Sequence, residues 1–461
     1  MSGLLMVGFR EKHGISCARL EKLKESLAVR SIYMIQVDHT NTFDDCCQGV
    51  IDFSKAVFGR YDDMPIDERS LDDETLSLLA GYELEIMYMM RRQGHHYHSL
   101  TNCKNLYLKH LKYWTAFLET YDIKGVVFHG IPHEVFDYII FRLCEKKGIH
   151  VAFGESLYAY EEIIGKRWIY VNRLEFDDDW LKSKNKELLA ETDAGGMSRE
   201  MSTRFETYAR KLRETATNTN SMVRRSTVWR WVHEDIKLHY GVKGNLIKRA
   251  SHYLYGFVPT MCLWHYYNRF AINPDFNEKY VYVPLHYSPE CTSSPQGGGI
   301  YADQVLFIDI LSRSLPKGIR IYVKENPAQS AFGREKEFYD RLRKIRNVKI
   351  IRIDTNQQEL IQKSLAIATL TGTAGYEGQF FGKPFLMFGY HLARYAPGTI
   401  PVRNEIECKK ALTAIIEDDY RMWNDEDIKK YLLFLYHASF DEVDCSDEEF
   451  VRNILRAMGR G

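Results

Sequence analysis

Strands and helices alternate regularly between residues 280 and 389, and this alternation restricts the fold more than any other feature of the sequence. Short runs rich in apolar and β-branched residues predict buried strands, and the segments between them have apolar residues at helical spacing. Because strands joined by helices run parallel, this region predicts a parallel sheet with right-handed crossovers. The predicted strands are residues 280–285, 319–325, 348–354, 365–370 and 384–389, and the predicted helices are residues 301–315, 333–345 and 356–364, with a short helix after residue 370.

The N-terminal part of the chain has the same kind of pattern over a shorter distance. Residues 126–130 predict a strand, residues 133–148 a helix that ends at Gly148, and residues 149–154 a second strand. Residues 30–38 predict a further strand, and helical spacing recurs at residues 16–27, 76–90 and 106–121. A chain of 461 residues is too long for one core, so we expect an α/β protein with two Rossmann-like domains.

Changes of pattern divide the chain into four predicted segments. They are a Rossmann-like domain of residues 1–174, a helical insertion of residues 175–277, a second Rossmann-like domain of residues 278–410, and C-terminal helices at residues 411–461 that could cross back to the first domain. Within the insertion, residues 224–269 hold eight Lys/Arg against two Asp/Glu. This basic, aromatic segment could be a membrane-surface or acceptor-binding patch, but we favour an ordinary helical insertion with a solvated basic face.

Composition excludes several classes of protein. Lys+Arg and Asp+Glu are both 62, so no general attraction to nucleic acid is expected. The apolar run at residues 4–9 is too short for a signal peptide, and no stretch of about 18 apolar residues occurs, so we expect neither a signal peptide nor a transmembrane helix. The nine cysteines are odd in number and have no CxxC spacing, which predicts reduced thiols in a cytoplasmic protein. The acidic residues 441–449 predict a solvated face, and the run Asp177–Asp179 predicts a helix cap.

Polar residues gather where the predicted strands of residues 278–410 end, which is the edge at which open parallel sheets bind ligands. They are His286, Lys324, Glu325, Asn326, Asp354, Thr371, Gly372, Thr373, Ala374, Gly375 and Glu377. A lysine, a histidine, hydroxyl groups and the unpaired N–H groups of a helix N-terminus suit a phosphate, and we expect a nucleotide there. Glu377 could accept hydrogen bonds from ribose hydroxyls. Taken one at a time, Lys324, Gly375 and Glu377 also fit a snorkelling lysine, a turn glycine and a charge favoured by the helix dipole.

The N-terminal domain has its own candidates at strand ends. Glu155 follows a predicted strand, and His129 and His133 lie in the loop after another. We predict Glu155 as a general base or nucleophile, with His129 and His133 in support. Each of these residues also fits a polar loop residue or a helix cap. The cluster His95–His98 lacks a second pair of ligands and predicts a surface turn rather than a zinc site.

Four stretches carry a resemblance to a known family. YVPLHYSPECTSSPQGGGIYADQ (residues 282–304), VKENP (323–327) and LTGTAGYEGQFFGKP (370–384) resemble bacterial capsule and surface polysaccharide biosynthesis proteins, which are similar to Kdo-transferase-type GT-B glycosyltransferases. FHGIPHEVFDYIIFRLCEKKGI (128–149) resembles the N-terminal half of the same proteins. Asn326 is a departure, because the family usually has KEHP where this chain has KENP.

The resemblance implies two Rossmann-like domains that face a cleft, with the nucleotide sugar on the C-terminal domain and a glycan or glycolipid acceptor on the N-terminal one. It implies a glycosyltransferase of hexosyl or Kdo type, with a CMP-Kdo-like donor as the first expectation. No GxGxxG, P-loop or suitable DxD motif is present, so we expect no cofactor and no metal requirement. The alternatives are a nucleotide-sugar epimerase, a non-catalytic component of a polysaccharide assembly complex, and a peripheral membrane scaffold. The expected location is the cytoplasm, with the cytoplasmic face of the membrane as the alternative, and the inner membrane or polysaccharide assembly proteins are candidate peripheral contacts.

Overall fold

The computed structural model describes residues 2–37, 43–67, 70–93, 99–165, 167–189, 196–217, 254, 257–331 and 333–460. The chain forms two compact units. The first consists of Met1–Met90, Tyr97–Lys184 and Phe434–Gly461, and the second of Arg91–His96 and Asn185–Leu433. The histidine cluster at residues 95–98 and most of the basic segment at residues 224–269 lie outside the described residues.

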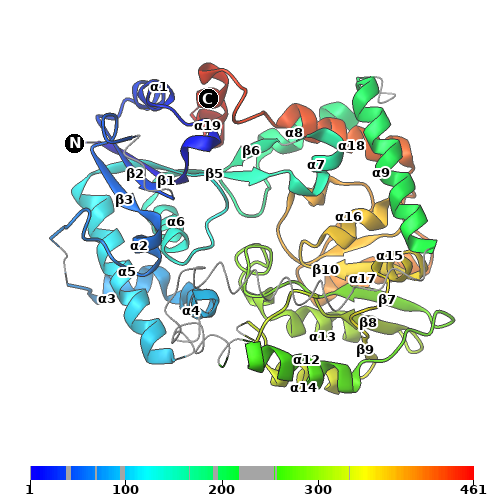
Figure 1. Cartoon of the computed structure of the whole chain (residues 1–461). Helices are drawn as coiled ribbons and strands as arrows, with labels where there is room; N and C mark the ends of the chain where they lie inside the picture. The colour runs from blue at the N-terminus through cyan, green and yellow to red at the C-terminus, as the bar shows by residue number, and fades with distance from the viewer. Residues whose placement is uncertain are drawn as a thin grey trace. The chain divides into compact units, whose positions relative to one another are not determined.

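The first unit is built on a six-stranded sheet in the order β3-β2-β1-β4-β5-β6 (Figure 1). Its strands are parallel except β6, which pairs antiparallel with β5. Every residue of β2 is buried, as expected for a parallel strand covered on both faces. The strands are β1 Gly3–Phe9, β2 Ser31–Gln36, β3 Gly49–Asp52, β4 Ile123–Phe128, β5 His150–Ser156 and β6 Trp168–Val171.

The helices of the first unit follow the predicted periodicity with shifted ends. The segment expected as one helix at residues 76–90 is two helices, α3 and α4, and Gly148 ends α6 in the left-handed conformation as predicted. Asp178 caps α8 by accepting the N–H of Leu181, which confirms the predicted cap. The helices are α1 Cys17–Leu27, α2 Phe53–Val57, α3 Asp73–Leu79, α4 Glu83–Met90, α5 Leu100–Thr120, α6 Phe136–Lys147, α7 Glu161–Ile164 and α8 Asp179–Leu189, the last of which runs into the second unit.

The C-terminal segment completes the first unit. Helix α18 spans Asp425–Ala438, begins in the second unit and enters the first at Phe434, and α19 spans Asp447–Ala457. Between these helices, Phe440 exchanges two backbone hydrogen bonds with Trp168 of β6, at 2.9 and 3.0 Å. Helix α19 lies beside α1 (Figure 1) and contributes Phe450 and Ile454 to the core of the unit.

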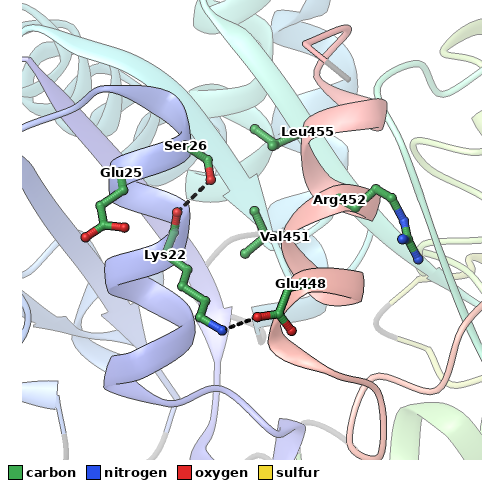
Figure 2. Close-up of a pocket in the computed structure, with 7 residues that line it drawn as sticks. All are labelled: Lys22, Glu25, Ser26, Glu448, Val451, Arg452 and Leu455. Carbon is green, nitrogen blue, oxygen red and sulfur yellow. Dashed lines mark hydrogen bonds and ion pairs between the residues drawn. The ribbon is translucent and has the colours of Figure 1, made fainter.

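The seam between α1 and α19 leaves a surface groove of about 310 Å³ (Figure 2). Lys22 of α1 pairs with the exposed carboxylate of Glu448 across it. The acidic stretch around this seam was expected to be a solvated face, and that expectation is wrong for Glu442, which is 2% exposed. Asp447 stays partly exposed and accepts a hydrogen bond from Arg19. A buried carboxylate needs partners, and those of Glu442 are too distant in sequence for a local pattern to indicate.

A disulfide joins Cys17, the first residue of α1, to Cys46, with 5.6 Å between the Cα atoms. The expectation of reduced thiols is therefore wrong for this pair. The two cysteines are 29 residues apart, and no motif marks them. The parallel pairing of β1, β2 and β3 brings their loops together, which spacing in the sequence does not show.

The second unit contains six parallel strands in the order β12-β11-β10-β7-β8-β9, confirming the predicted parallel sheet. Helices α12, α13, α14 and α17 pack on one face, and α15 and α16 on the other. The strands are β7 Tyr280–Pro284, β8 Arg320–Lys324, β9 Val348–Ile351, β10 Ala366–Thr369, β11 Phe385–Met387 and β12 Thr399–Pro401. The helices are α9 Arg199–Thr217, α12 Val258–Phe270, α13 Gln304–Ser314, α14 Lys336–Lys344, α15 Gln357–Lys363, α16 Thr373–Gln379 and α17 Glu405–Ile416. None of the helices described in either unit is long and apolar enough to cross a membrane.

The strand order reverses once in each sheet. In the first unit the reversal lies between β1 and β4, and in the second between β7 and β10. At such a point the two crossovers leave in opposite directions, so the carboxyl ends of the two strands open a crevice. The residues directly after these four strands are therefore the first places to look for a ligand site.

Candidate functional site

A pocket of about 230 Å³ lies at the carboxyl ends of β7, β8 and β10 in the second unit. The structure brings most of the predicted binding residues to it: His286, Lys324, Glu325, Asn326, Thr371, Gly372, Thr373 and Ala374. Asp354, Gly375 and Glu377 do not line it. The prediction missed Tyr282, Pro284, Leu285, Thr292, Pro327, Gln357 and Thr369, which also line the pocket.

His286 follows β7 and is held on both sides. The side-chain amide of Gln304 accepts the N–H of His286 at 2.9 Å and donates to its carbonyl at 3.2 Å. The ring Nε2 accepts the backbone N–H of Thr371 at 3.1 Å. Because a backbone N–H can only donate, Nε2 is unprotonated and the proton of the neutral ring is on Nδ1. Burial lowers the pKa of His286 to about 3, with repulsion from Arg334 adding to the effect, so the ring that lines the pocket is neutral.

Acid should weaken the folded chain through His286. Its pKa is about 3 in the folded state and 6.5 in the unfolded state, so the unfolded chain takes up the proton first as the pH falls below 6.5. This stability is present above pH 6.5 and is lost progressively toward pH 3. In urea unfolding, His286→Gln should show about 2 kcal/mol less loss of stability than wild type between pH 7.5 and pH 5. Equal acid sensitivity of the two proteins would contradict this assignment.

Lys324 is the last residue of β8 and is 4% exposed. Burial lowers its pKa to about 8, while Asp354 and Glu377 partly oppose that shift. Both carboxylates are engaged elsewhere. Asp354 pairs with Arg352 through two contacts of 2.8 and 3.0 Å, and Glu377 accepts from Gln357 and Gln358 at 3.2 and 3.3 Å.

The ammonium of Lys324 is therefore attracted electrostatically by Asp354 and Glu377 but forms no ion pair with either carboxylate. No hydrogen bond or ion pair reaches it from any of the residues described in this structure. A buried cation is stable only when an opposite charge or hydrogen-bond acceptors compensate it. The pocket is consequently suited to an anionic ligand.

Glu325 lines the pocket, but its carboxylate is hydrogen-bonded to other side chains of the protein. It accepts from Arg334 Nε at 3.0 Å and from the Tyr339 hydroxyl at 2.7 Å. Arg334 also donates to the carbonyl of His286 at 2.9 Å. We expected Glu325 to bind the nucleotide-sugar donor. Its carboxylate instead holds Arg334, which connects the end of β8 to the residue that follows β7. Asn326 closes the turn after β8, where its side-chain oxygen accepts the N–H of Ala328 at 2.9 Å.

The turn between β10 and α16 supplies backbone and hydroxyl groups to the pocket. The prediction for the amide of Gly375 needs a correction. The Gly375 amide was predicted to bind phosphate, but it donates to the carbonyl of Gly372 at 2.9 Å. Glycine is required at residue 375 for packing, because a Cβ there would lie 2.4 Å from the ring of Phe385. Thr371 donates its hydroxyl to the carbonyl of Thr292 at 3.3 Å.

The candidates of the first unit occupy three different settings. Glu155 is half-buried within β5, which continues to Ser156, so it lies in a strand and not after one. His133 precedes α6, with Nδ1 2.6 Å from the carbonyl of Ile131. His129 directly follows β4, and its Nε2 is 3.0 Å from a carboxylate oxygen of Glu442. The sequence analysis missed Glu442 because it lies in the acidic stretch that was expected to be solvated.

No group of three or more His, Cys, Asp or Glu side chains is placed to hold a metal ion in the part of the chain that the structure describes.

Comparison with known proteins gives one family. Residues 296–397 match the family described as capsule polysaccharide biosynthesis protein, which confirms the resemblance over that part of the chain. The match includes the turn after β10 and the end of β8. No curated protein sequence matches the chain.

Solved structures with a similar chain include transferases and epimerases. KpsC of Thermosulfurimonas dismutans, a beta Kdo 2,7 transferase, is 11% identical, covers 78% of this chain and 90% of its own, and gives a TM-score of 0.30. UDP-GlcNAc 2-epimerase from Methanocaldococcus jannaschii, in complex with UDP-GlcNAc and UDP, is 12% identical with 95% and 100% covered and a TM-score of 0.29. The Neisseria meningitidis enzyme bound to UDP-GlcNAc is 13% identical with 100% of both chains covered and a TM-score of 0.25. At these TM-scores the similarities carry no weight for function.

Proposed function

We propose that this chain is a glycosyltransferase of bacterial capsule or surface polysaccharide biosynthesis. The observation that carries the proposal is the pocket lined both by the buried ammonium of Lys324, which no hydrogen bond or ion pair reaches from the described residues, and by the neutral imidazole of His286. The family match over residues 296–397 supports the biosynthetic role and covers much of this pocket. The pocket would hold the phosphate of a nucleotide sugar, with a CMP-Kdo-like donor as the first candidate.

The proposed chemistry requires charge stabilisation on the leaving nucleotide. As the bond from the anomeric carbon to the phosphate oxygen breaks, negative charge grows on the phosphate. Lys324 and the Nδ1–H of His286 are fixed donors in a buried setting, where such groups stabilise developing charge most effectively. These residues could do so without a metal ion. The acceptor, a glycan or glycolipid, would bind the first unit, and we propose a cytoplasmic location with contact to membrane or assembly proteins.

A panel of CMP-, UDP- and GDP-sugars tests the proposal. Titration calorimetry on the wild-type chain measures binding, and release of free nucleotide with and without a glycan acceptor measures turnover. We expect one nucleotide class to bind and to be turned over faster with acceptor. Binding without turnover would favour a non-catalytic component, and conversion to an epimeric sugar nucleotide would favour the epimerase. Absence of binding across the panel would overturn both enzymatic functions.

A further inference from the structure

Tyr282 of β7 is a buried tyrosine whose hydroxyl has no partner within the described protein. The side chain is 0% exposed, and the residue lines the pocket at the carboxyl ends of β7, β8 and β10. None of the described residues forms a hydrogen bond with its hydroxyl. Buried polar atoms are nearly always satisfied, by protein, water or ligand. The hydroxyl of Tyr282 is therefore a candidate contact for the molecule that the pocket binds.

Two other tyrosines of the same core cluster show how unusual this hydroxyl is. Tyr280, two residues earlier on β7, donates to the carbonyl of Leu360 at 2.8 Å. Tyr322, which pairs with Tyr282 across the ladder, donates to a carboxylate oxygen of Glu278 at 2.6 Å. The three tyrosines pack together on the face of the sheet that α15 and α16 cover. If Tyr282 only filled this core, phenylalanine would do so without burying an unpaired hydroxyl.

The strand register places Tyr282 and Lys324 on the same face of the sheet. In the parallel ladder, Tyr282 pairs with Tyr322 of β8. Lys324 lies two residues after Tyr322, and side chains on a strand alternate between the two faces, so both point to the face of Tyr282. The buried ammonium and the buried hydroxyl thus come from neighbouring strands, and their residues line one pocket.

One carboxylate acts on both groups. Burial raises the pKa of Tyr282 well above its usual range, and the charge of Glu377 adds to that shift, so the hydroxyl keeps its proton and can donate. Glu377 also partly opposes the lowering of the pKa of Lys324. This common influence agrees with a hydroxyl and an ammonium that lie close together. Both groups can offer hydrogens to a ligand, and the ammonium can only donate.

We infer that the hydroxyl of Tyr282 is a second donor to the phosphate group that Lys324 binds. The inference rests on the proposed function and adds a binding residue to the same pocket. An ionised phosphate has several acceptor oxygens, so it can accept from the ammonium and from the phenol at the same time. A cationic or purely apolar ligand would leave both donors unpaired. The tyrosine adds a hydrogen bond without the cost of burying a second cation.

Tyr282→Phe tests the hydroxyl alone, because it removes one oxygen atom and keeps the ring. Titration calorimetry with CMP, UDP, GDP and inorganic phosphate measures binding. For each of these probes that wild type binds, we expect a Kd about 10-fold weaker in Tyr282→Phe. Tyr280→Phe is the matched control, since Tyr280 belongs to the same strand and core cluster but does not line the pocket, and its Kd should equal that of wild type. Unchanged binding of every probe by Tyr282→Phe would overturn the inference.

The same two variants should differ in stability when no ligand is added. Tyr280→Phe leaves the buried carbonyl of Leu360 without its donor and should lower the urea midpoint. Tyr282→Phe removes a hydroxyl that has no partner among the described residues and should not lower it. An equal fall in both midpoints would show that the hydroxyl of Tyr282 is already satisfied without a ligand, and this result would also overturn the inference.

Inorganic phosphate separates this inference from the proposed function. If wild type binds phosphate but no nucleotide, the glycosyltransferase proposal fails, and the phosphate Kd of Tyr282→Phe relative to wild type still decides the role of the hydroxyl. If wild type binds a nucleotide and Tyr282→Phe binds it equally well, only the inference fails. If wild type binds none of the four probes, both fail.

Discussion

Replacing Lys324 with methionine is expected to remove nucleotide binding and to make the protein more stable. The ammonium of Lys324 is the only cation at the end of β8 within the described pocket lining, and a charge-assisted hydrogen bond to phosphate contributes about 1.5–3 kcal/mol. Its loss corresponds to a Kd about 10- to 150-fold weaker. Methionine fills the same volume without a charge to desolvate, so the fold should be retained.

The stability gain follows from the sign of the pKa shift. Burial lowers the pKa of Lys324 from 10.5 to about 8, so the charged form is disfavoured in the folded chain. That cost is fully present below about pH 8 and disappears as the pH rises toward 10.5. Removing the charge should therefore stabilise the chain at pH 7 by up to about 3 kcal/mol, and the gain should shrink above pH 8.

Urea unfolding at pH 7 and pH 9.5, with calorimetric titration of the nucleotide, measures both effects. The matched control is Lys317→Met, an exposed lysine that precedes the other end of β8. Wild-type affinity should also decline as the pH rises through about 8, whereas residual binding by Lys324→Met should not. A Lys324→Met chain that binds nucleotide like wild type would rule out Lys324 as the phosphate ligand.

The pocket of the second unit was predictable because it depends on order along the chain. Alternating strands and helices define a parallel sheet, and ligands bind at its carboxyl edge, so His286, Lys324 and Thr371 could be selected from their positions at strand ends. Thr292 was missed because it reaches the pocket from a loop whose path the pattern does not define, and Gln357 because it reaches the pocket from the first residue of α15. Gly375 was selected for its amide, although it is glycine because of the ring of Phe385.

The contact between His129 and Glu442 in the first unit was predictable only in part. His129 could be chosen because it follows a strand, but its partner Glu442 is 313 residues away. The contact depends on the antiparallel pairing of Phe440 with Trp168, which brings the C-terminal segment back to the first sheet. Nothing local distinguishes Glu442 from its solvated acidic neighbours. Sequence periodicity predicts local elements, but it does not predict which distant segments pair.

Glu325 was expected to bind the nucleotide, but its carboxylate pairs with Arg334, a contact that the sequence pattern does not show. This buried ion pair leads to the second prediction with a large expected effect. Replacing Arg334 with methionine should destabilise the chain by about 3–5 kcal/mol, because it leaves the carboxylate of Glu325 buried without its counter-ion. The two side chains are 3% and 1% exposed, so water cannot take the place of the guanidinium. The same change removes a donor to the carbonyl of His286, and nucleotide affinity should fall as the strand end loosens.

Two further variants separate a broken ion pair from lost packing. In the double variant Glu325→Gln/Arg334→Met no charge is left buried, and Gln can still accept from Tyr339, so most of the lost stability should return. Arg341→Met, on the same helix α14, breaks an exposed pair with Asp303 and should cost no more than about 1 kcal/mol in urea unfolding. If Arg334→Met costs no more than Arg341→Met, the buried pair is not what holds the ends of β7 and β8 together. If the double variant recovers stability without recovering nucleotide affinity, the guanidinium contributes to the site through His286 and not only through Glu325.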